Sequence, residues 1–369
     1  MISRRSLLRT ASLAFTAASA APLRGLTNPT IIPAPGLKDL APHNLLVGAV
    51  IGKWQMQDPR WLPLVLDNFN LITNGQLKWE FIRPSATDFD FRETDWMIDF
   101  CRGHHLALHG HNLCWNASNP AWLTQTLTKD NAEGILSDHI HTVVKRYAGK
   151  ITSWDVVNEP VATWMGRPDS LYKGPWLDAL GSRYIDIAFH ATAEADPNAL
   201  RVLNIAHVEQ GGIGCDTARF ATLHLIESLL KRGVPIQAVG FESHLAGDYA
   251  ASSTPARARF VSELRGMGLQ ILLTEIDIDD TRVPGDPASR DAVVGERYES
   301  YLSTILREAN PSRIIFFSPS DQRNWYDALH TSQYNRKDGT PHRPGLFDNS
   351  LQPKAAYASV ASSLKGYRV

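Results

Sequence analysis

The sequence predicts an α/β fold, a single (β/α)8 (TIM) barrel. Eight short apolar segments recur along the 369-residue chain, and eight is the number of strands that closes such a barrel. Stretches with helical periodicity lie between them, and a regular alternation of strand and helix implies a parallel sheet. No linker or internal repeat divides the chain. One barrel is therefore the simplest arrangement, although the length alone would also allow two ordinary domains.

The expected elements follow from apolar periodicity and from the turn residues that separate the segments. Strands are expected at residues 45–51, 69–75, 106–113, 151–158, 200–206, 238–244, 271–276 and 314–319. Helices are expected between them, among others at residues 135–147, 184–195, 218–231, 256–267 and 297–309.

Polar side chains gather where the expected strands end. In a parallel barrel all of these strand ends meet at one face, so side chains from most of the chain should converge there. The set comprises Lys78, Trp79, His109, His111, Trp115, Asn158, Glu159, His207, Glu242, His244, Glu275, Asp277, Asp321 and Trp325.

Two of these strand ends present a glutamate in the same way. Residues 154–160 read Trp-Asp-Val-Val-Asn-Glu-Pro, an apolar run that must stop at Pro160 because proline has no N–H for a central strand. The run at 269–277 likewise ends in Glu275. Two carboxylates at one end of a barrel can flank a glycosidic bond, one as acid and base, the other as nucleophile. Each glutamate alone would fit an ordinary ion pair, but the two together favour catalysis.

The N-terminal residues have the pattern of an export signal. Arg4 and Arg5 stand directly before an apolar stretch, and Ala18-Ser19-Ala20 has the small residues of a cleavage site. Residues 1–20 are therefore expected to be a twin-arginine-type signal peptide, because the apolar stretch is short for the alternative of a membrane anchor. A Pro-rich lead-in (21–43) and the catalytic domain (44–369) would follow. The mature protein would be periplasmic or secreted.

Charge and cysteine content exclude some classes of partner and site. A net charge of −1 gives no electrostatic reason to expect nucleic acid or an anionic membrane as a partner. Cys101, Cys114 and Cys215 lack the spacing of a zinc knuckle and allow at most one disulfide, and three buried free thiols are the simplest expectation.

Taken together, these residues make the chain resemble glycoside hydrolase family 10, whose best-known members are retaining endo-β-1,4-xylanases. The resemblance covers roughly residues 45–357. Its motifs are Lys78-Trp79, Gly110-His111 with Trp115 and Pro120-Ala-Trp122, Trp154 to Pro160, Ser243-His244, Thr274 to Asp277, Asp321 with Trp325, and Leu346-Phe347-Asp348.

The resemblance implies a role for each matching residue. Glu159 would be the acid/base and Glu275 the nucleophile of a double displacement. Asp277 and Glu242 would support them, and no metal or cofactor would be needed. The substrate would be xylan or a related polysaccharide, bound by a monomer. The substrate-binding residues would be Lys78, His111, Trp115, Asn158, His244 and Trp325.

Several family positions differ, and most of them would contact neighbouring sugars or line the cleavage subsite. The usual Glu-Asn before Lys-Trp is Asn74-Gly75, and the usual Gln before Ser-His is Glu242. The other differences are Asn116 and Ser118 after Trp115, Ile205 to His207 on the fifth strand, and Phe317 in place of Trp on the eighth. The reaction type is therefore better supported than the substrate, and a decorated xylan or another β-glycan is an alternative.

Two other kinds of protein compete with this interpretation. A metal-dependent, amidohydrolase-like barrel could use His109, His111, His207, His244 and Asp321. That hypothesis leaves Glu275 without a role and places His-x-His on the third strand rather than the first. A non-catalytic sugar-binding barrel is the other alternative, but such a protein would normally lack one catalytic carboxylate.

Overall fold

The computed structural model describes residues 35–249, 254–329 and 331–367. The expected signal peptide and residues 21–34 of the lead-in lie outside the described residues. Among the helices of the described chain, none is long and apolar enough to cross a membrane.

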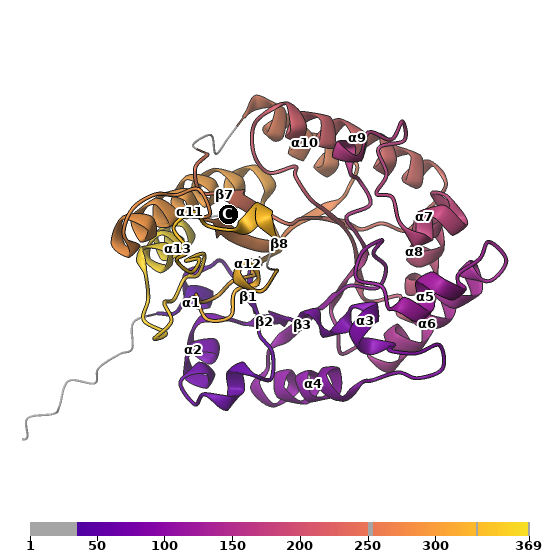
Figure 1. Cartoon of the computed structure of the whole chain (residues 1–369), viewed down its shortest axis with the longest axis horizontal. Helices are drawn as coiled ribbons and strands as arrows, with labels where there is room; N and C mark the ends of the chain where they lie inside the picture. Colours follow the sequence, from indigo (N-terminus) through magenta and orange to yellow (C-terminus); the bar gives the residue numbers. More distant parts are fainter. Residues whose placement is uncertain (1–34, 250–253, 330, 368–369) are drawn as a thin grey trace, which may run out of the picture. The chain divides into compact units, whose positions relative to one another are not determined.

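The predicted eight-stranded parallel barrel is confirmed (Figure 1). Strands follow the order β6-β5-β4-β3-β2-β1-β9-β8, and direct pairing of β6 with β8 closes the ring. Every pairing is parallel, as the alternation of strand and helix requires. The strands are β1 (Leu46–Val50), β2 (Leu71–Thr73), β3 (Ala107–His111), β4 (Ser153–Asn158), β5 (Leu200–Ile205), β6 (Ala238–Phe241), β7 (His244–Ala246), β8 (Gln270–Asp279) and β9 (Arg313–Phe316).

The prediction of one continuous strand over residues 238–244 is wrong, because the strand is interrupted after Phe241. Strand β6 ends at Phe241, and the short β7 begins at His244 and pairs only with the end of β8. Ser243 between them has a φ of 64°, a left-handed conformation that interrupts strand pairing. Its backbone N–H donates to Glu209 (2.9 Å), and its hydroxyl contacts that of Tyr301 (2.8 Å). The break therefore separates His244 from the β6–β8 ladder and places it in the short β7–β8 ladder, opposite Asp277.

Helices surround the barrel (Figure 1). All five helices expected from periodicity are present, as α6, α8, α9, α10 and α11. The helices are α1 (Leu37–Leu40), α2 (Trp61–Asn68), α3 (Trp79–Ile82), α4 (Arg92–His104), α5 (Ala121–Thr126), α6 (Ala132–Arg146), α7 (Pro175–Leu180), α8 (Arg183–Ala195), α9 (Ile213–Lys231), α10 (Pro255–Gly266), α11 (Pro287–Ala309), α12 (Trp325–Leu329) and α13 (Ala355–Gly366). Short 3-10 turns occupy η1 (Gln55–Gln57), η2 (Gly75–Leu77), η3 (Thr163–Met165) and η4 (Ser332–Tyr334).

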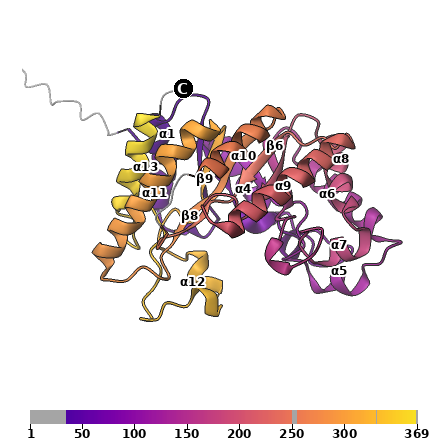
Figure 2. The same cartoon turned by 90° about the horizontal axis from the view of Figure 1, so that it is seen from above.

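The first and last helices of the described chain meet at the amino end of the barrel. In α1, Leu37 is buried and its N–H donates to Asn68 (3.3 Å), which also accepts a hydrogen bond from Tyr357 of α13 (2.9 Å). Just after α13, Tyr367 donates to Asn310, the residue that ends α11 (2.6 Å). Figure 2 shows α1 and α13 side by side, with α12 on the opposite side of the molecule.

The three cysteines are free. Cys101 and Cys114 are buried as expected, whereas Cys215 at the start of α9 is only half-buried. The fold therefore holds together without a disulfide.

Candidate active site

The residues expected at the catalytic face lie at or just beyond the carboxyl ends of the strands. Asn158 ends β4, and Glu159 follows it. Glu275 and Asp277 lie in the second half of the long strand β8, and His244 is the first residue of β7. The remaining expected site residues, Lys78, His111, Trp115, Glu242 and Trp325, come from the ends of β2, β3 and β6 and from α12.

Glu275 is buried and held from both oxygens. Its Oε1 accepts a hydrogen bond from the Asn204 amide (2.7 Å), and its Oε2 lies 3.3 Å from Nε2 of His244. His111 Nδ1 is 3.8 Å from Oε1. Burial alone would raise the pKa of Glu275, but the electrostatic interactions with His111 and His244 and the hydrogen bond from His244 outweigh it, so the pKa lies below the ordinary value. The surroundings therefore keep this carboxylate ionised.

Asp277 holds His244 in place from the side opposite Glu275. One of its oxygens lies 2.7 Å from His244 Nδ1 and accepts from the Tyr326 hydroxyl (2.7 Å). The other accepts from Ser318 (2.8 Å) and from the indole N–H of Trp325 (2.6 Å). Burial lowers the pKa of His244, but the carboxylates of Asp277 and Glu275 outweigh it and raise that pKa well above the ordinary value. A cationic His244 results, which faces Glu275.

A second buried carboxylate, Asp155, holds His111. Nδ1 of His111 and Nε2 of His109 both lie 2.9 Å from Oδ2 of Asp155. Burial would raise the pKa of Asp155, but the two histidines lower it to about 2. Gly110 between the histidines allows this arrangement, because a Cβ there would lie 2.1 Å from the Trp154 ring of β4. The Gly-His and Trp-Asp motifs therefore fit together across two neighbouring strands.

Glu159 has the opposite electrostatic environment. Burial, followed by the negative charge of Glu275, raises its pKa to about 7, although His244 and Lys78 act in the other direction. Its backbone is left-handed, with a φ of 47°, and its N–H donates to the carbonyl of Asn204 (2.9 Å). Non-glycine residues in this conformation occur mostly where the surrounding structure enforces it, as at active sites. Glu159 is thus largely protonated below neutral pH.

Asn204 connects the two glutamates, a role that was not predicted from the sequence. Its amide donates to Glu275 and also to Asn158 Oδ1 (2.7 Å), while its own oxygen accepts from Thr274 (2.6 Å). A glycine on β6 makes room for it, since a Cβ at Gly240 would lie 2.2 Å from Asn204 Oδ1. A strand asparagine followed by Ile205 and Ala206 carries no pattern that would have identified it.

Glu242 is a third buried carboxyl in the site. Burial, followed by the negative charges of Glu159 and Glu275, raises its pKa well above the ordinary value. Nearby Glu209 is also buried with a raised pKa, and it was not identified from the sequence. The raised pKa favours the protonated form of Glu242, which has a shape and a donor proton comparable to those of a glutamine side chain.

The differences that follow Trp115 have structural roles. Asn116 is buried and accepts from the backbone N–H groups of Trp176 (3.2 Å) and Leu177 (3.3 Å), so it holds the start of α7. The Ser118 hydroxyl donates to Glu80. The Lys78 ammonium lies over the ring of Trp115, with Nζ 5.0 Å from the ring centroid.

Two hollows adjoin the site. The β1–β9 pocket, about 190 Å³, is lined by residues including Trp54, Asn74, Gly75, Phe317, Arg323 and Trp325. The second hollow, about 590 Å³, includes Trp164, His207, Cys215 and Gln333. Trp164 is 53% exposed, and its ring meets that of His207 edge-on at 4.8 Å. Aromatic rings at both hollows suit stacking against sugars.

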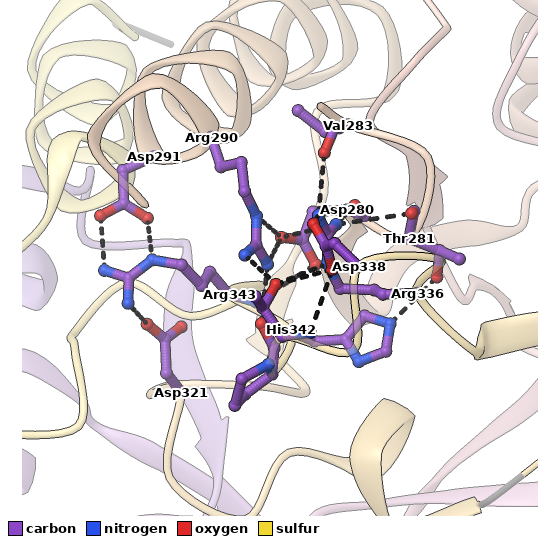
Figure 3. A network of polar contacts seen from close by, with 12 residues as sticks. Asp280, Thr281, Val283, Arg290, Asp291, Asp321, Arg336, Asp338, His342 and Arg343 are labelled. Carbon is purple, nitrogen blue, oxygen red and sulfur yellow. Dashed lines mark hydrogen bonds and ion pairs between the residues drawn. The ribbon is translucent and has the colours of Figure 1, made fainter. Parts of the chain in front are cut away.

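A buried ion network fixes the loops beside the site (Figure 3). Asp280, which follows β8, accepts from Arg290 Nε of α11 (2.9 Å) and lies 3.6 Å from Arg336. Arg336 also donates to the carbonyl of Val283 (3.1 Å). The network therefore ties the segment after α12 to the end of the strand that carries Glu275.

The residues of the metal-dependent alternative do not converge. Asp321 forms an ion pair with Lys354 (3.0 Å), and His207 packs against Trp164. The one group among the described residues with metal-ligand spacing is His111, Asp155 and Glu275, whose ligand atoms lie within 4.8 Å of one another. Asp155 and Glu275 in that group already have the histidine and amide partners described above.

A parallel barrel with an ionised and a protonated glutamate at its carboxyl face defines a barrel glycosidase as the class of protein. The chain belongs to glycosyl hydrolase family 10, whose sequence model matches residues 36–363. It is 30% identical over 322 residues to endo-1,4-beta-xylanase B of Thermotoga neapolitana, covering 86% of this chain and 88% of that protein.

Solved structures agree with this assignment. Native xylanase 10B from Thermotoga maritima superposes with a TM-score of 0.78 at 25% identity, covering 89% of this chain and 98% of that one. Xylanase 10B from Thermotoga petrophila RKU-1, solved in complex with xylobiose, gives 0.76 at 25% identity over 89% and 97% of the two chains.

Proposed function

We propose that the protein is a retaining endo-β-1,4-xylanase that acts on xylan or a related polysaccharide. The observation that carries the proposal is the pair of glutamates joined through Asn204 at one face of the barrel, in opposite electrostatic environments that raise the pKa of Glu159 to about 7 and lower that of Glu275. The membership in family 10 and the xylanases among its relatives support the substrate class. The paired arginines Arg4 and Arg5 support export to the periplasm or beyond.

In the first step, Glu159 gives its proton to the glycosidic oxygen while the Glu275 carboxylate attacks the anomeric carbon. The bond to the leaving sugar breaks, and an ester between Glu275 and the remaining glycosyl group forms. Water then attacks the same carbon, loses its proton to Glu159 and releases the sugar from Glu275. Both glutamates return to their starting protonation states.

The surrounding residues position the sugar for these steps. Asn158 has its oxygen occupied by Asn204, so its amide N–H groups are directed to the sugar, where a bond to the 2-hydroxyl strengthens as positive charge develops. Lys78, His111 and His244 bind the same sugar, and Trp115 and Trp325 pack around it. Asp277 keeps His244 oriented and charged.

Removal of the nucleophile tests the assignment. The variant Glu275→Ala is expected to lose activity on aryl β-xylosides by about 10⁴-fold or more, because the ester cannot form. Azide should restore turnover by occupying the vacated space and attacking the anomeric carbon, and the product should be a glycosyl azide. Asp99→Ala, on the exposed surface of α4, is the control. Substantial activity of Glu275→Ala without azide would contradict the proposal.

A further inference from the structure

The β1–β9 pocket differs in charge from the rest of the site. Among the residues that line it in the described chain, Arg323 carries the only charge. The guanidinium lies over the Trp54 ring, 4.7 Å from the centroid, which fixes its orientation. Arg323 makes no hydrogen bond or ion pair with the described residues. The described lining of the β1–β9 pocket thus includes one cation and no acidic group, and Asp58 lies with Arg323 on the lining of an adjacent hollow.

A second donor in the pocket also lacks a partner. Asn74 is 4% exposed, and its oxygen accepts from the backbone N–H of Gln76 (3.1 Å). Its amide nitrogen is buried and has no hydrogen-bond partner among the described residues. Such an unpaired buried donor normally costs about 1–3 kcal/mol unless a ligand or water accepts from it. An acceptor oxygen of a water or of a ligand would satisfy this donor.

Space for such a ligand comes from Gly75 and Phe317. A Cβ built at Gly75 would meet only the end of Lys78, at 3.8 Å from Cε and 3.9 Å from Nζ, so a side chain would fit there and its absence leaves room. Phe317 meets the ring of His244 edge-on at 5.4 Å and lines the pocket where the family resemblance implies the larger tryptophan. Gly75 and Phe317 thus leave space in the pocket that larger residues would fill.

We propose that the β1–β9 pocket binds an acidic side group, a hexuronic acid carried by the β-1,4-linked chain, and that Arg323 pairs with its carboxylate. The inference rests on the proposed function and goes beyond it by naming the decoration. A guanidinium can bind a carboxylate through two parallel hydrogen bonds, and the Asn74 amide adds a donor for the hydroxyl or ring oxygens. The decorated xylan is then preferred over the bare chain.

The test compares two polymers that differ only in charge. Glucuronoxylan is one, and the other is the same polymer after chemical reduction of its carboxyl groups, which leaves neutral hexose side groups of similar size. At low ionic strength the ratio of kcat/KM for the acidic to the neutral polymer is expected to be about tenfold or more. In Arg323→Gln the ratio should fall to about one.

Two further variants separate charge from shape. Gly75→Asn fills the pocket without altering its charge and should also lower the ratio. Arg102→Gln removes an exposed guanidinium on α4 that pairs with Asp99, so it matches the change in net charge and should keep the wild-type ratio. A wild-type ratio near one, or a high ratio that survives in Arg323→Gln, would overturn the inference.

A binding measurement keeps this inference separate from the catalytic proposal. In the Glu275→Ala background, calorimetric titration with a glucuronic acid-substituted xylo-oligosaccharide should give a Kd about tenfold lower than its carboxyl-reduced counterpart. The difference should vanish when Arg323→Gln is added, and equal affinities before that change would refute the acidic pocket. Failure of the wild type to hydrolyse either polymer would instead contradict the proposed function.

Discussion

Glu159 shows how the surroundings of a side chain set its pKa and thereby its chemical role. Its pKa of about 7 arises first from burial, and the first chemical step requires its proton. Because the protonated form is lost as the pH rises, kcat/KM is expected to fall about tenfold per pH unit above pH 7, while the ionised Glu275 sets the limit on the acidic side. Measuring kcat/KM for unactivated xylo-oligosaccharides over a series of pH values determines both the acidic and the basic limb of the pH–rate profile.

The assignment of the basic limb can be checked with a variant. In Glu159→Ala the limb should disappear for aryl xylosides whose leaving group needs no protonation. A limb that persists in Glu159→Ala would mean that another group titrates there.

Glu242 makes a pH-dependent contribution to stability. A carboxyl with a raised folded-state pKa binds its proton more tightly when folded, so its stabilising contribution is complete below its ordinary pKa of 4.5 and is lost as the pH rises toward the folded-state value. Glu242→Gln has no proton to lose. It is expected to be more stable than the wild type by about 1–3 kcal/mol at neutral pH, with the difference vanishing near pH 4.

Urea denaturation at a series of pH values measures this difference. Glu227→Gln on α9 alters an exposed carboxyl and should leave the pH dependence unchanged. A difference between Glu242→Gln and the wild type that stays constant from pH 4 to neutrality would contradict the linkage argument.

Single residues also show what the sequence could not predict. Glu159 and Glu275 follow recognisable apolar runs, so the sequence pattern predicts their positions. Asn204 and Asp155 act through partners that are distant in the chain, and neither residue type nor spacing reveals those contacts. The space that Gly240 leaves for Asn204 exists only once β5 and β6 are paired.

At the scale of elements, the network around Asp280 stabilises the junction of β8, α11 and the segment after α12. Asp280 and Arg290 are 0% and 2% exposed. Replacing Asp280 by Asn would leave the guanidinium groups of Arg290 and Arg336 buried near each other without their shared carboxylate. The variant Asp280→Asn is expected to lower the free energy of unfolding by about 3–5 kcal/mol.

An exposed pair provides the comparison for this measurement. Asp99→Asn breaks the ion pair with Arg102, whose side chains are 67% and 78% exposed, and should cost less than about 1 kcal/mol in urea denaturation. If Asp280→Asn were as mild as Asp99→Asn, the network would contribute little to stability.

Strand existence was easier to predict than strand continuity. Apolar runs located all eight barrel strands, but the break at Ser243 depends on its hydrogen bonds to Glu209 and Tyr301, which come from other elements. Helix α1 similarly owes its place to contacts with Asn68 and α13, because four residues are too few to form a stable helix alone.

At the scale of the whole molecule, the closed barrel determines the distance between the two glutamates. The backbone of Glu159 is bonded to Asn204, whose side chain is bonded to Glu275, so the connection between them is short. We expect their carboxyl groups to lie about 5–5.5 Å apart, which leaves no room for an intervening water. Proton NMR of the first product formed should therefore show the β anomer, with the α anomer appearing only later by mutarotation. An initial α anomer would require an inverting mechanism.

The barrel itself was predictable because its signal is spread over the whole chain. Each strand and helix contributes a weak pattern, and eight consistent patterns leave one closed arrangement. Substrate preference has no such redundancy, since it depends on a few side chains such as Asn74 and Arg323. Their role in binding can be inferred only after the fold has brought them to one pocket.

The meeting of α1 and α13 at the amino end of the barrel has a practical consequence. Both ends of the described chain lie on the side of the molecule opposite α12, the helix that begins with the site residue Trp325 (Figure 2). A protein immobilised on a solid support through either end would direct its cleft outward. Coupling through a terminal tag should therefore preserve access to insoluble fibres, whereas coupling through surface lysines in random orientations would bury part of the clefts against the support.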